Sequence, residues 1–157
     1  ANDRKVIGKE FPSWTAGLGA NLYYKDFDLS FFLRGTIGND ILNATRMAYA
    51  QSGFLPGTNA LDDPLTYTLS ETPRFSNYYL EKGSFMRLDN LTLGYKIKAL
   101  NGIRVYFTAQ NLFVITKYKG LDPEVPMDSG DGLTPGVEPR EFYPKARTFS
   151  VGLNLNF

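Results

Sequence analysis

The carboxylates that could do chemistry lie in one glycine- and proline-rich stretch, residues 114–144. Asp122 is followed closely by Glu124, and Asp128 by Asp131. Glycosidases use two carboxyl groups about 5–10 Å apart across a sugar, so these pairs have suitable residue types. They lie in a loop without a rigid scaffold, however, and the chain has no histidine or cysteine to act as base or nucleophile. The pattern favours solvated loop charge, so we expect no enzyme and no catalytic residue.

Residues 128–132, Asp-Ser-Gly-Asp-Gly, also have the composition of a calcium-binding turn, because calcium takes oxygen ligands from flexible loops. The later bidentate glutamate of an EF-hand loop is missing from this stretch. The sequence therefore predicts no cofactor and no metal ligand, with calcium in this loop as the alternative.

Aromatic and basic side chains gather in a second place, which contains Arg74, Phe75, Tyr78 and Tyr79. Their rings could stack on sugar faces or pack against the side chains of a peptide. They could equally anchor the loop to its neighbours. We favour anchoring and keep ligand contact as the alternative.

These side chains must be positioned by strands, and the clearest strand is at the end of the chain. From Phe149 every second residue is apolar, which predicts a strand with one apolar face. Similar alternation predicts five strands in all, over residues 14–24, 27–37, 84–97, 103–113 and 145–157. In the third strand, Arg87 and Asp89 have the parity of Leu91 but are too polar for lipid. We expect that half of the strand to project above a bilayer.

The connections between these strands alternate in length. Residues 25–26 and 98–102 are short turns, whereas residues 38–83 and 114–144 are long loops. Outer-membrane barrels alternate short periplasmic turns with long external loops, while loops this long are uncommon in a small soluble domain. The order of loop lengths therefore favours a membrane barrel.

The first long loop contains one predicted helix, over residues 40–52. Asn39 or Asp40 could cap its first turn, and Gly53 could end it. The rest of this loop is rich in proline, glycine and aspartate, which is typical of turns.

The composition supports the membrane interpretation. The chain has 10 Tyr, 12 Phe and 1 Trp, many of them near expected strand ends, which is typical of interfacial girdles. No apolar run approaches the length of a transmembrane helix, and a net charge of +1 gives no sign of nucleic-acid binding. We predict an all-β fold, antiparallel strands of a multi-pass transmembrane β-barrel in the outer membrane. The alternative is a soluble β-sandwich that binds carbohydrate.

Five strands are too few for such a barrel, since single-chain bacterial barrels have an even number of strands and at least eight. Open sheet edges are not tolerated in lipid. We therefore expect the C-terminal part of a larger barrel, whose remaining strands pair with the edges of this segment.

Several motifs resemble one family of such barrels. Residues 79–95 contain Gly-Ser-Phe-Met-Arg-Leu-Asp-Asn-Leu-Thr-Leu-Gly-Tyr, which resembles a signature of the SusC/RagA-like TonB-dependent transporters of Bacteroidetes. Three further stretches resemble the C-terminal region of that family in the same order: residues 27–32 with 38–41, residues 109–113 with 120–124, and residues 143–149 leading to Phe157. The resemblance covers nearly the whole chain.

The resemblance implies a barrel of about 22 strands, of which this chain would supply the last five. The family's plug, TonB box and N-terminal domain lie outside this chain. The family's activity would be active import of oligomeric nutrients, glycans or peptides, across outer-membrane lipid. A SusD-like lipoprotein lid and the TonB complex would be its partners. A passive porin, which needs neither plug nor lid, is a further alternative.

Three groups of residues have expected roles on this interpretation. Contacts with the substrate or the lid are expected at Arg74, Tyr78, Tyr79, Asp128 and Asp131. Positions facing the lumen, in contact with the plug or the import path, are expected at Arg34, Arg104, Tyr106 and Gln110. A terminal assembly signal, read by the insertion machinery, is expected at Phe149, Val151, Leu153, Leu155 and Phe157.

Overall fold

The structure is a computed structural model that describes residues 5–57, 59–64, 66, 74–100, 102–124, 135–139 and 143–155. It divides into two compact units. The loop unit consists of residues Ala1–Ser13, Ile37–Ser84 and Lys117–Pro144. The sheet unit consists of residues Trp14–Thr36, Phe85–Thr116 and Lys145–Phe157.

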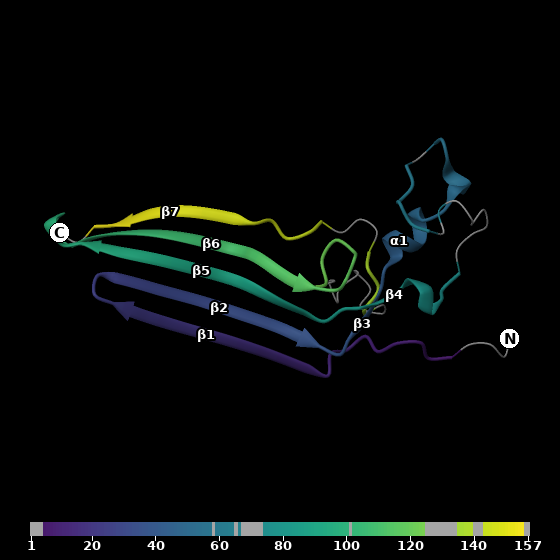
Figure 1. Cartoon of the computed structure of the whole chain (residues 1–157), viewed down its shortest axis with the longest axis horizontal. Helices are drawn as coiled ribbons and strands as arrows, with labels where there is room; N and C mark the ends of the chain where they lie inside the picture. The colour runs from purple at the N-terminus through teal and green to yellow at the C-terminus, as the bar shows by residue number, and fades with distance from the viewer. Residues whose placement is uncertain are drawn as a thin grey trace. The chain divides into compact units, whose positions relative to one another are not determined.

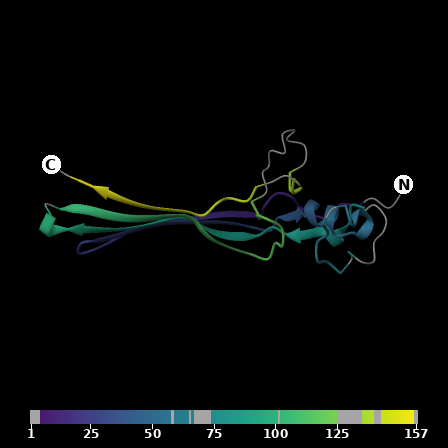
Figure 2. The ribbon, with the colours of Figure 1, turned by 90° about the horizontal axis from the view of Figure 1, so that it is seen from above.

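The sheet unit is built from five strands in the order β1-β2-β5-β6-β7. Their bounds are β1 Trp14–Tyr24, β2 Phe27–Ile37, β5 Phe85–Ile97, β6 Ile103–Thr116 and β7 Thr148–Asn154. The β2–β5, β5–β6 and β6–β7 pairs are antiparallel. The strands lie side by side in Figure 1, and Figure 2 shows them as one layer.

The strand bounds follow the sequence pattern closely. β1 and β2 coincide with the two expected strands, and β5 begins one residue later than expected. β6 continues beyond residue 113 to Thr116, whereas β7 occupies only Thr148–Asn154 of the expected residues 145–157. The prediction of an all-β, antiparallel fold is confirmed. Among the described residues, none of the helices is long and apolar enough to cross a membrane.

The two faces of the sheet differ sharply in polarity. One row across the strands pairs Leu29 with Leu93, Leu93 with Phe107 and Phe107 with Val151. Large apolar side chains of this row remain exposed, with Leu93 at 45%, Phe107 at 39% and Val151 at 75%. The next row lies on the opposite face and contains Ser30, Thr92, Thr108 and Ser150. A contiguous exposed apolar face of this kind marks a surface that contacts protein or lipid.

A bulge in β5 corrects the expected position of Arg87. Phe32 is opposite Asn90 but Leu33 is opposite Leu88, so Asp89 is an extra residue in the ladder. Arg87 is then directly opposite Arg34, and directly opposed residues share a face. The prediction that Arg87 lies on the side of Leu91 is therefore wrong. The extra residue moves it to the polar face.

Arg87 is also far from solvent in this position, since only 1% of it is exposed. Its guanidinium donates to the side-chain oxygen of Asn111 and lies 5.6 Å from the ring of Phe85. Asn111 itself has a φ of 52° within β6, at the level of the bulge. The irregularity thus runs through two neighbouring strands and buries a charged side chain between them.

The loop unit contains a small two-stranded sheet and one short helix. β3 (Asp40–Leu42) pairs antiparallel with β4 (Leu80–Lys82), and α1 spans Ala44–Tyr49. Short 3₁₀ turns follow at η1 (Ser52–Phe54) and η2 (Asn77–Tyr79). A third 3₁₀ turn, η3 (Lys98–Leu100), belongs to the sheet unit and joins β5 to β6.

The predicted helix over residues 40–52 is largely wrong. Residues Asp40–Leu42 are held in an extended conformation by pairing with β4. The helix starts only at Ala44, and its cap is Asn43, whose side-chain oxygen accepts from the backbone N–H of Arg46 at 2.8 Å. Pairing with a distant strand has therefore overridden the local helix signal.

Candidate functional site

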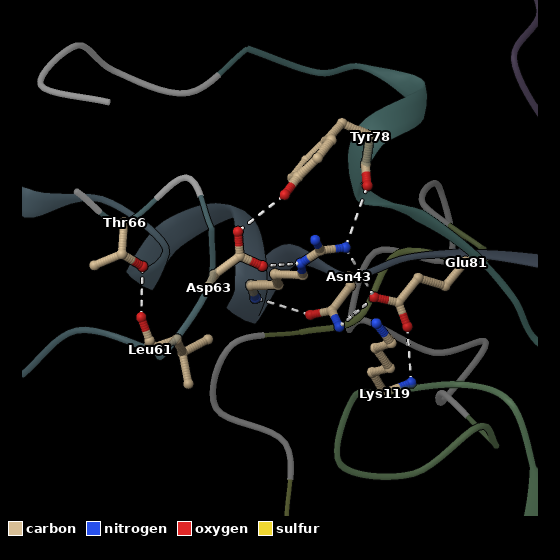
Figure 3. Close-up of polar contacts among 8 residues, drawn as sticks. Asn43, Leu61, Asp63, Thr66, Tyr78, Glu81 and Lys119 are labelled. Atoms are coloured by element: carbon tan, nitrogen blue, oxygen red, sulfur yellow. Dashed lines mark hydrogen bonds and ion pairs between the residues drawn. The ribbon is translucent and has the colours of Figure 1, made fainter. Parts of the chain in front are cut away.

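Arg46 is the centre of the polar contacts in the loop unit. Its Nε donates to Oδ2 of Asp63 at 2.6 Å, and one terminal nitrogen donates to the backbone oxygen of Tyr78 at 3.3 Å. The Tyr78 ring lies 4.5 Å from the guanidinium. The Tyr78 hydroxyl donates to the second oxygen of Asp63 at 3.0 Å, as Figure 3 shows. α1, residues 61–64 and η2 are thereby tied together.

The charge of Arg46 is stabilised by these contacts. Burial alone would lower the pKa of Arg46, but the hydrogen bond and charge of Asp63, together with the charge of Glu81, raise it. The Arg46 side chain is 17% exposed and that of Asp63 is 8% exposed. The pair is therefore mostly withdrawn from water. An ion pair in such a position needs further hydrogen bonds to offset the cost of desolvation. Tyr78 supplies one of them.

Two carboxylates, the partly exposed Glu81 and the buried Glu138, join α1 to residues 119–121. Oε1 of Glu81 accepts from the side-chain nitrogen of Asn43 at 3.2 Å, and Oε2 accepts from the backbone N–H of Lys119 at 2.7 Å. Figure 3 shows Glu81 between Asn43 and Lys119. In Glu138, one oxygen accepts from the backbone N–H of Thr45 at 3.3 Å and the other from that of Leu121 at 3.2 Å. Each carboxylate thus bridges the same two segments.

Glu138 is the more deeply buried of the two, with 1% exposed. Tyr118 lies beside it, and its pKa is raised first by burial and then by the negative charge and hydrogen bonding of Glu138. A protonated, neutral Tyr118 is therefore part of the packing behind residues 119–121.

A cleft of about 390 Å³ lies in front of these bridges. It is lined by three segments, namely Asn43, Thr45 and Arg46 of the α1 region, residues 61–64 and residues 119–121. The Oγ1 of Thr45 is buried, and the described residues supply no hydrogen-bond partner for it. The cleft is therefore a concave surface whose walls are tied together by hydrogen bonds.

The expected loop-contact residues are distributed unevenly. Tyr78 lies in the Arg46 network, whereas Tyr79 is buried at 2% exposure and packs edge-on against the Tyr78 ring at 5.1 Å. Arg74 is exposed and is not among the residues that line the cleft. Asp128 and Asp131 lie outside the described residues, as does the calcium alternative.

The first carboxylate pair of the sequence serves a local turn. Asp122 is buried, and its Oδ1 accepts from the backbone N–H of Glu124 at 2.9 Å. Within the described part of the chain, His, Cys, Asp and Glu form no cluster of three that could hold a metal ion.

The sequence did not reveal the residues that build the cleft. Arg46, Asp63, Glu81 and Glu138 each meet partners that are distant in the chain. The available local signal was Asn43, an N-cap residue placed three positions before Arg46. Glu138 had no comparable signal, because its partners are backbone groups of other segments.

In the sheet unit, the four residues expected to face the lumen share one face. Arg34 forms an ion pair with Asp89, and Arg104 forms one with Asp28. The Arg104 guanidinium also lies 5.1 Å from the centre of the Tyr106 ring. Gln110 is exposed and lies opposite Asn90. The charges of Arg34 and Arg104 are therefore paired within the sheet.

The terminal strand presents the expected apolar series. Phe149, Val151, Leu153 and Leu155 are all exposed, while Phe157 lies outside the described residues. Phe149 stacks on Phe107 of β6 with ring centres 6.1 Å apart. β7 has β6 as its neighbour on one side and is the last strand of the sheet on the other.

Comparison with known proteins gives consistent relatives, although no family model matches the chain. It is 36% identical over 173 residues to the TonB-dependent receptor SusC of Bacteroides thetaiotaomicron. It is 34% identical over 179 residues to the TonB-dependent receptor P3 of Formosa agariphila. These alignments cover 100% and 99% of this chain but only 16% and 17% of the relatives.

Solved structures give the same answer. The RagAB peptide importer in its closed-closed state matches with a TM-score of 0.73 and 26% identity, over 95% of this chain and 18% of that one. A further structure of the RagAB peptide transporter matches with a TM-score of 0.71 over 94% of this chain and 17% of that one. The relatives' names describe receptors and transport proteins, not enzymes. The motifs, the antiparallel sheet and these similarities together identify this chain as a segment of a SusC/RagA-like TonB-dependent transporter.

Proposed function

We propose that this chain forms part of the wall and external loops of an outer-membrane active importer of oligomeric nutrients. The observation that carries the proposal is the single-layer sheet with one exposed apolar face, in a chain related to SusC and RagAB. Lipid is the natural solvent for such a face, because a barrel strand turns its apolar side chains outward. The five strands would be the last of about 22 in a closed, plugged barrel.

The polar face supports a position toward the lumen. Arg34 is neutralised by Asp89 of the neighbouring strand and Arg104 by Asp28, two strands away, which reduces the number of free charges that would face a plug or a passing cargo. Thr92 and Thr108 bond to each other at 3.1 Å across β5 and β6. Charges and hydroxyls that are paired in this way are suited to contact with another protein surface.

The loop unit would be external, and its partners follow from the relatives. A SusD-like lipoprotein would cover the external side, and the TonB complex would supply energy through the part of the protein outside this chain. Both SusC and the RagAB peptide importer match, which supports an oligomeric cargo, either glycan or peptide.

A soluble β-sandwich is the competing architecture. Sandwiches bury one face of each sheet against a second sheet about 10 Å away. Among the described residues, the apolar row through Leu93, Phe107 and Val151 has no such cover and stays exposed. This exposure favours the membrane wall.

Fractionation and uptake of the complete protein test the proposal. We expect the complete protein in outer-membrane fractions as a heat-modifiable barrel. Cells depleted of it should lose uptake of a labelled nutrient oligomer, and dissipating the proton-motive force should have the same effect. Recovery in the aqueous fraction would contradict the proposal. Uptake that persists without the proton-motive force would identify a passive porin.

A further inference from the structure

We propose that Tyr106 donates a hydrogen bond across β7 to the strand that pairs with the free edge of β7 in the complete barrel. Its partner would be an acceptor side chain on that strand, a carboxylate, amide or hydroxyl, at the position opposite Gly152. The inference rests on the proposed function in one respect, namely that the complete protein closes this edge. The contact itself is argued from the geometry of the sheet unit.

One row of the polar face contains two glycines at alternate positions. Asp28 of β2 is opposite Gly94 of β5, which is opposite Tyr106 of β6. Tyr106 is in turn opposite Gly152 of β7. Directly opposed residues share a face, so all four belong to the same polar surface. Each glycine therefore leaves room above its strand between two larger neighbours.

The first glycine shows what such a gap allows. A Cβ built on Gly94 would overlap the Arg104 guanidinium and the Asp28 carboxylate, because these groups meet in the space above β5. Arg104 lies on β6 and bonds from Nε to Oδ1 of Asp28 on β2 at 2.8 Å. A glycine in this row thus lets the side chain of one neighbouring strand cross over and bond on the other side.

Tyr106 crosses β7 in a similar way. A Cβ built on Gly152 would overlap both Cζ and the hydroxyl oxygen of Tyr106, so the end of the ring lies directly above β7. The hydroxyl is the part of this side chain farthest from its own backbone on β6, and it therefore points toward the far side of β7. The Arg104 guanidinium lies 5.1 Å from the ring centre, within the range of a cation–π contact that helps to fix the ring.

The far side of β7 is a free sheet edge. β7 is the last strand of the sheet and lies at its border in Figure 1. The part of the chain that the structure describes supplies no hydrogen-bond partner for the Tyr106 hydroxyl. A half-buried tyrosine usually has such a partner, and a free edge must be paired in lipid. The strand that pairs with this edge is thus placed to supply the acceptor.

The acceptor should be a side chain rather than a backbone group. Backbone carbonyls of a sheet lie near its plane and bond to neighbouring strands, whereas the Tyr106 hydroxyl lies above the plane. A residue opposite Gly152 on the pairing strand has its side chain on the same polar face. It would have the same relation to Tyr106 as Asp28 has to Arg104.

A simpler explanation is that Tyr106 only covers Gly152, since an aromatic side chain can compensate for a glycine in a neighbouring strand. Covering the glycine needs the ring but not the hydroxyl. The two explanations therefore differ in the effect of removing the hydroxyl alone.

Photocrosslinking in the complete receptor locates the partner. The probe is p-azidophenylalanine at position 106, which carries its azide where Tyr106 carries the hydroxyl. Irradiated outer-membrane fractions are mapped by mass spectrometry, and we expect crosslinks to the strand that closes the edge of β7. Tyr23, exposed on β1 at the other side of the sheet, is the matched control position and should give none to that strand. Crosslinks from position 106 to the plug alone, or to this chain alone, would overturn the inference.

Removing the hydroxyl tests the bond itself. Tyr106→Phe keeps the ring above Gly152 and should speed hydrogen exchange of the β7 amides by about 3- to 10-fold, the effect of one hydrogen bond. Tyr23→Phe should leave exchange of β7 unchanged. Gly152→Ala displaces the ring, so Tyr106→Phe should have no further effect in that background. Unchanged exchange of β7 in Tyr106→Phe would overturn the inference in favour of simple covering of Gly152.

The amount of folded barrel is measured for every variant by heat modifiability, so that a changed signal is not assigned to lost protein. A receptor that forms a folded barrel but crosslinks elsewhere would contradict this inference and leave the proposed function intact. A wild-type receptor that stays in the aqueous fraction would contradict both.

Discussion

Arg104 on β6 reaches across the full width of β5 to meet Asp28 on β2. Its Nε lies 2.8 Å from Oδ1 of Asp28, and its NH2 lies 2.5 Å from Oδ2. The residue of β5 beneath this contact is Gly94, which is directly opposite Asp28. A side chain at Gly94 would overlap atoms of both partners, so the ion pair depends on the absence of a Cβ there.

Gly94→Val should break this contact. The new side chain must displace the Arg104 guanidinium or the Asp28 carboxylate, because both lie within its volume. We expect a lower yield of heat-modifiable barrel and a transition shifted to lower temperature. Leu93→Val, one residue away on the other face, is the control and should have a smaller effect. Equal losses in both variants would contradict a specific dependence of the Arg104–Asp28 contact on Gly94.

Charges on the apolar face should be much more harmful than charges on the polar face. Leu93→Arg is expected to destabilise the inserted barrel by about 2–4 kcal/mol near the middle of the bilayer. Leu29→Arg, in the residue paired with Leu93, should do the same. Ser30→Arg lies on the opposite face and should cost much less. Reconstitution into vesicles with urea titration measures the difference, and equal effects on the two faces would reverse the assigned orientation.

Arg46→Met should loosen the loop unit. Without the guanidinium, Asp63 and Glu81 lose their common positive partner while remaining largely withdrawn from water. Removing one partner of a buried ion pair typically destabilises the folded state by about 3–5 kcal/mol. This corresponds to an increase of roughly a hundredfold or more in the equilibrium constant for local opening. Hydrogen exchange of residues 44–50 and 77–82 measures it. Tyr78→Phe removes a single hydroxyl bond and should lower protection by about tenfold or less.

The contacts of Asp40 should be sensitive to acid. Burial alone would raise the pKa of Asp40, but the hydrogen bonds from the Lys82 ammonium and the Lys9 N–H outweigh it and lower the pKa. A lowered pKa means that the ionised carboxylate stabilises the loop unit above the usual pKa of about 3.9. The stabilisation is then lost as the pH falls through the pKa that Asp40 has in the folded protein.

Hydrogen exchange of residues 5–13, corrected for its intrinsic pH dependence, measures this loss. Protection should fall below about pH 4, the usual aspartate range, in the wild-type protein. Asp40→Asn should show weaker protection throughout and no such fall. A fall of the same size in the variant would assign the acid sensitivity to another carboxylate.

The terminal residue should matter for assembly more than for transport. Deleting Phe157 shortens the apolar series that continues from Val151, Leu153 and Leu155 at the end of β7. An edge strand with a regular apolar face is a template for strand pairing, so its loss should lower the amount of inserted barrel. Uptake per folded molecule should remain nearly normal. Normal insertion with lost uptake would instead place Phe157 in the transport mechanism.

The sequence by itself determined the strands and the family. Side chains alternate between the two faces of a strand, so a strand with one face toward lipid has an apolar residue at every second position of its sequence. That pattern set the bounds of β1 and β2 and nearly those of β5, because nothing beyond the local chain is needed to read it. The motifs of residues 79–95 carried the resemblance to SusC/RagA-like transporters for the same reason.

The tertiary structure alone decided where alternation fails. Asp89 is an extra residue in β5, and only the pairing of β5 with β2 and β6 shows that it is one. The alternation of the sequence alone therefore assigns Arg87 to the wrong face. Residues Asp40–Leu42 are extended because β4 pairs with them from about 40 positions away. A helix prediction that rests on neighbouring residues takes no account of such a distant strand.

The cleft was likewise beyond the sequence. Glu81 bonds to the N–H of Lys119 across 38 positions, and Glu138 bonds to that of Thr45 across 93. Both carboxylates recognise backbone N–H groups, which every residue except proline carries, so no residue type marks the partner. Only the folding of residues 43–46, 61–64 and 119–121 into one unit brings these three segments to the same cleft.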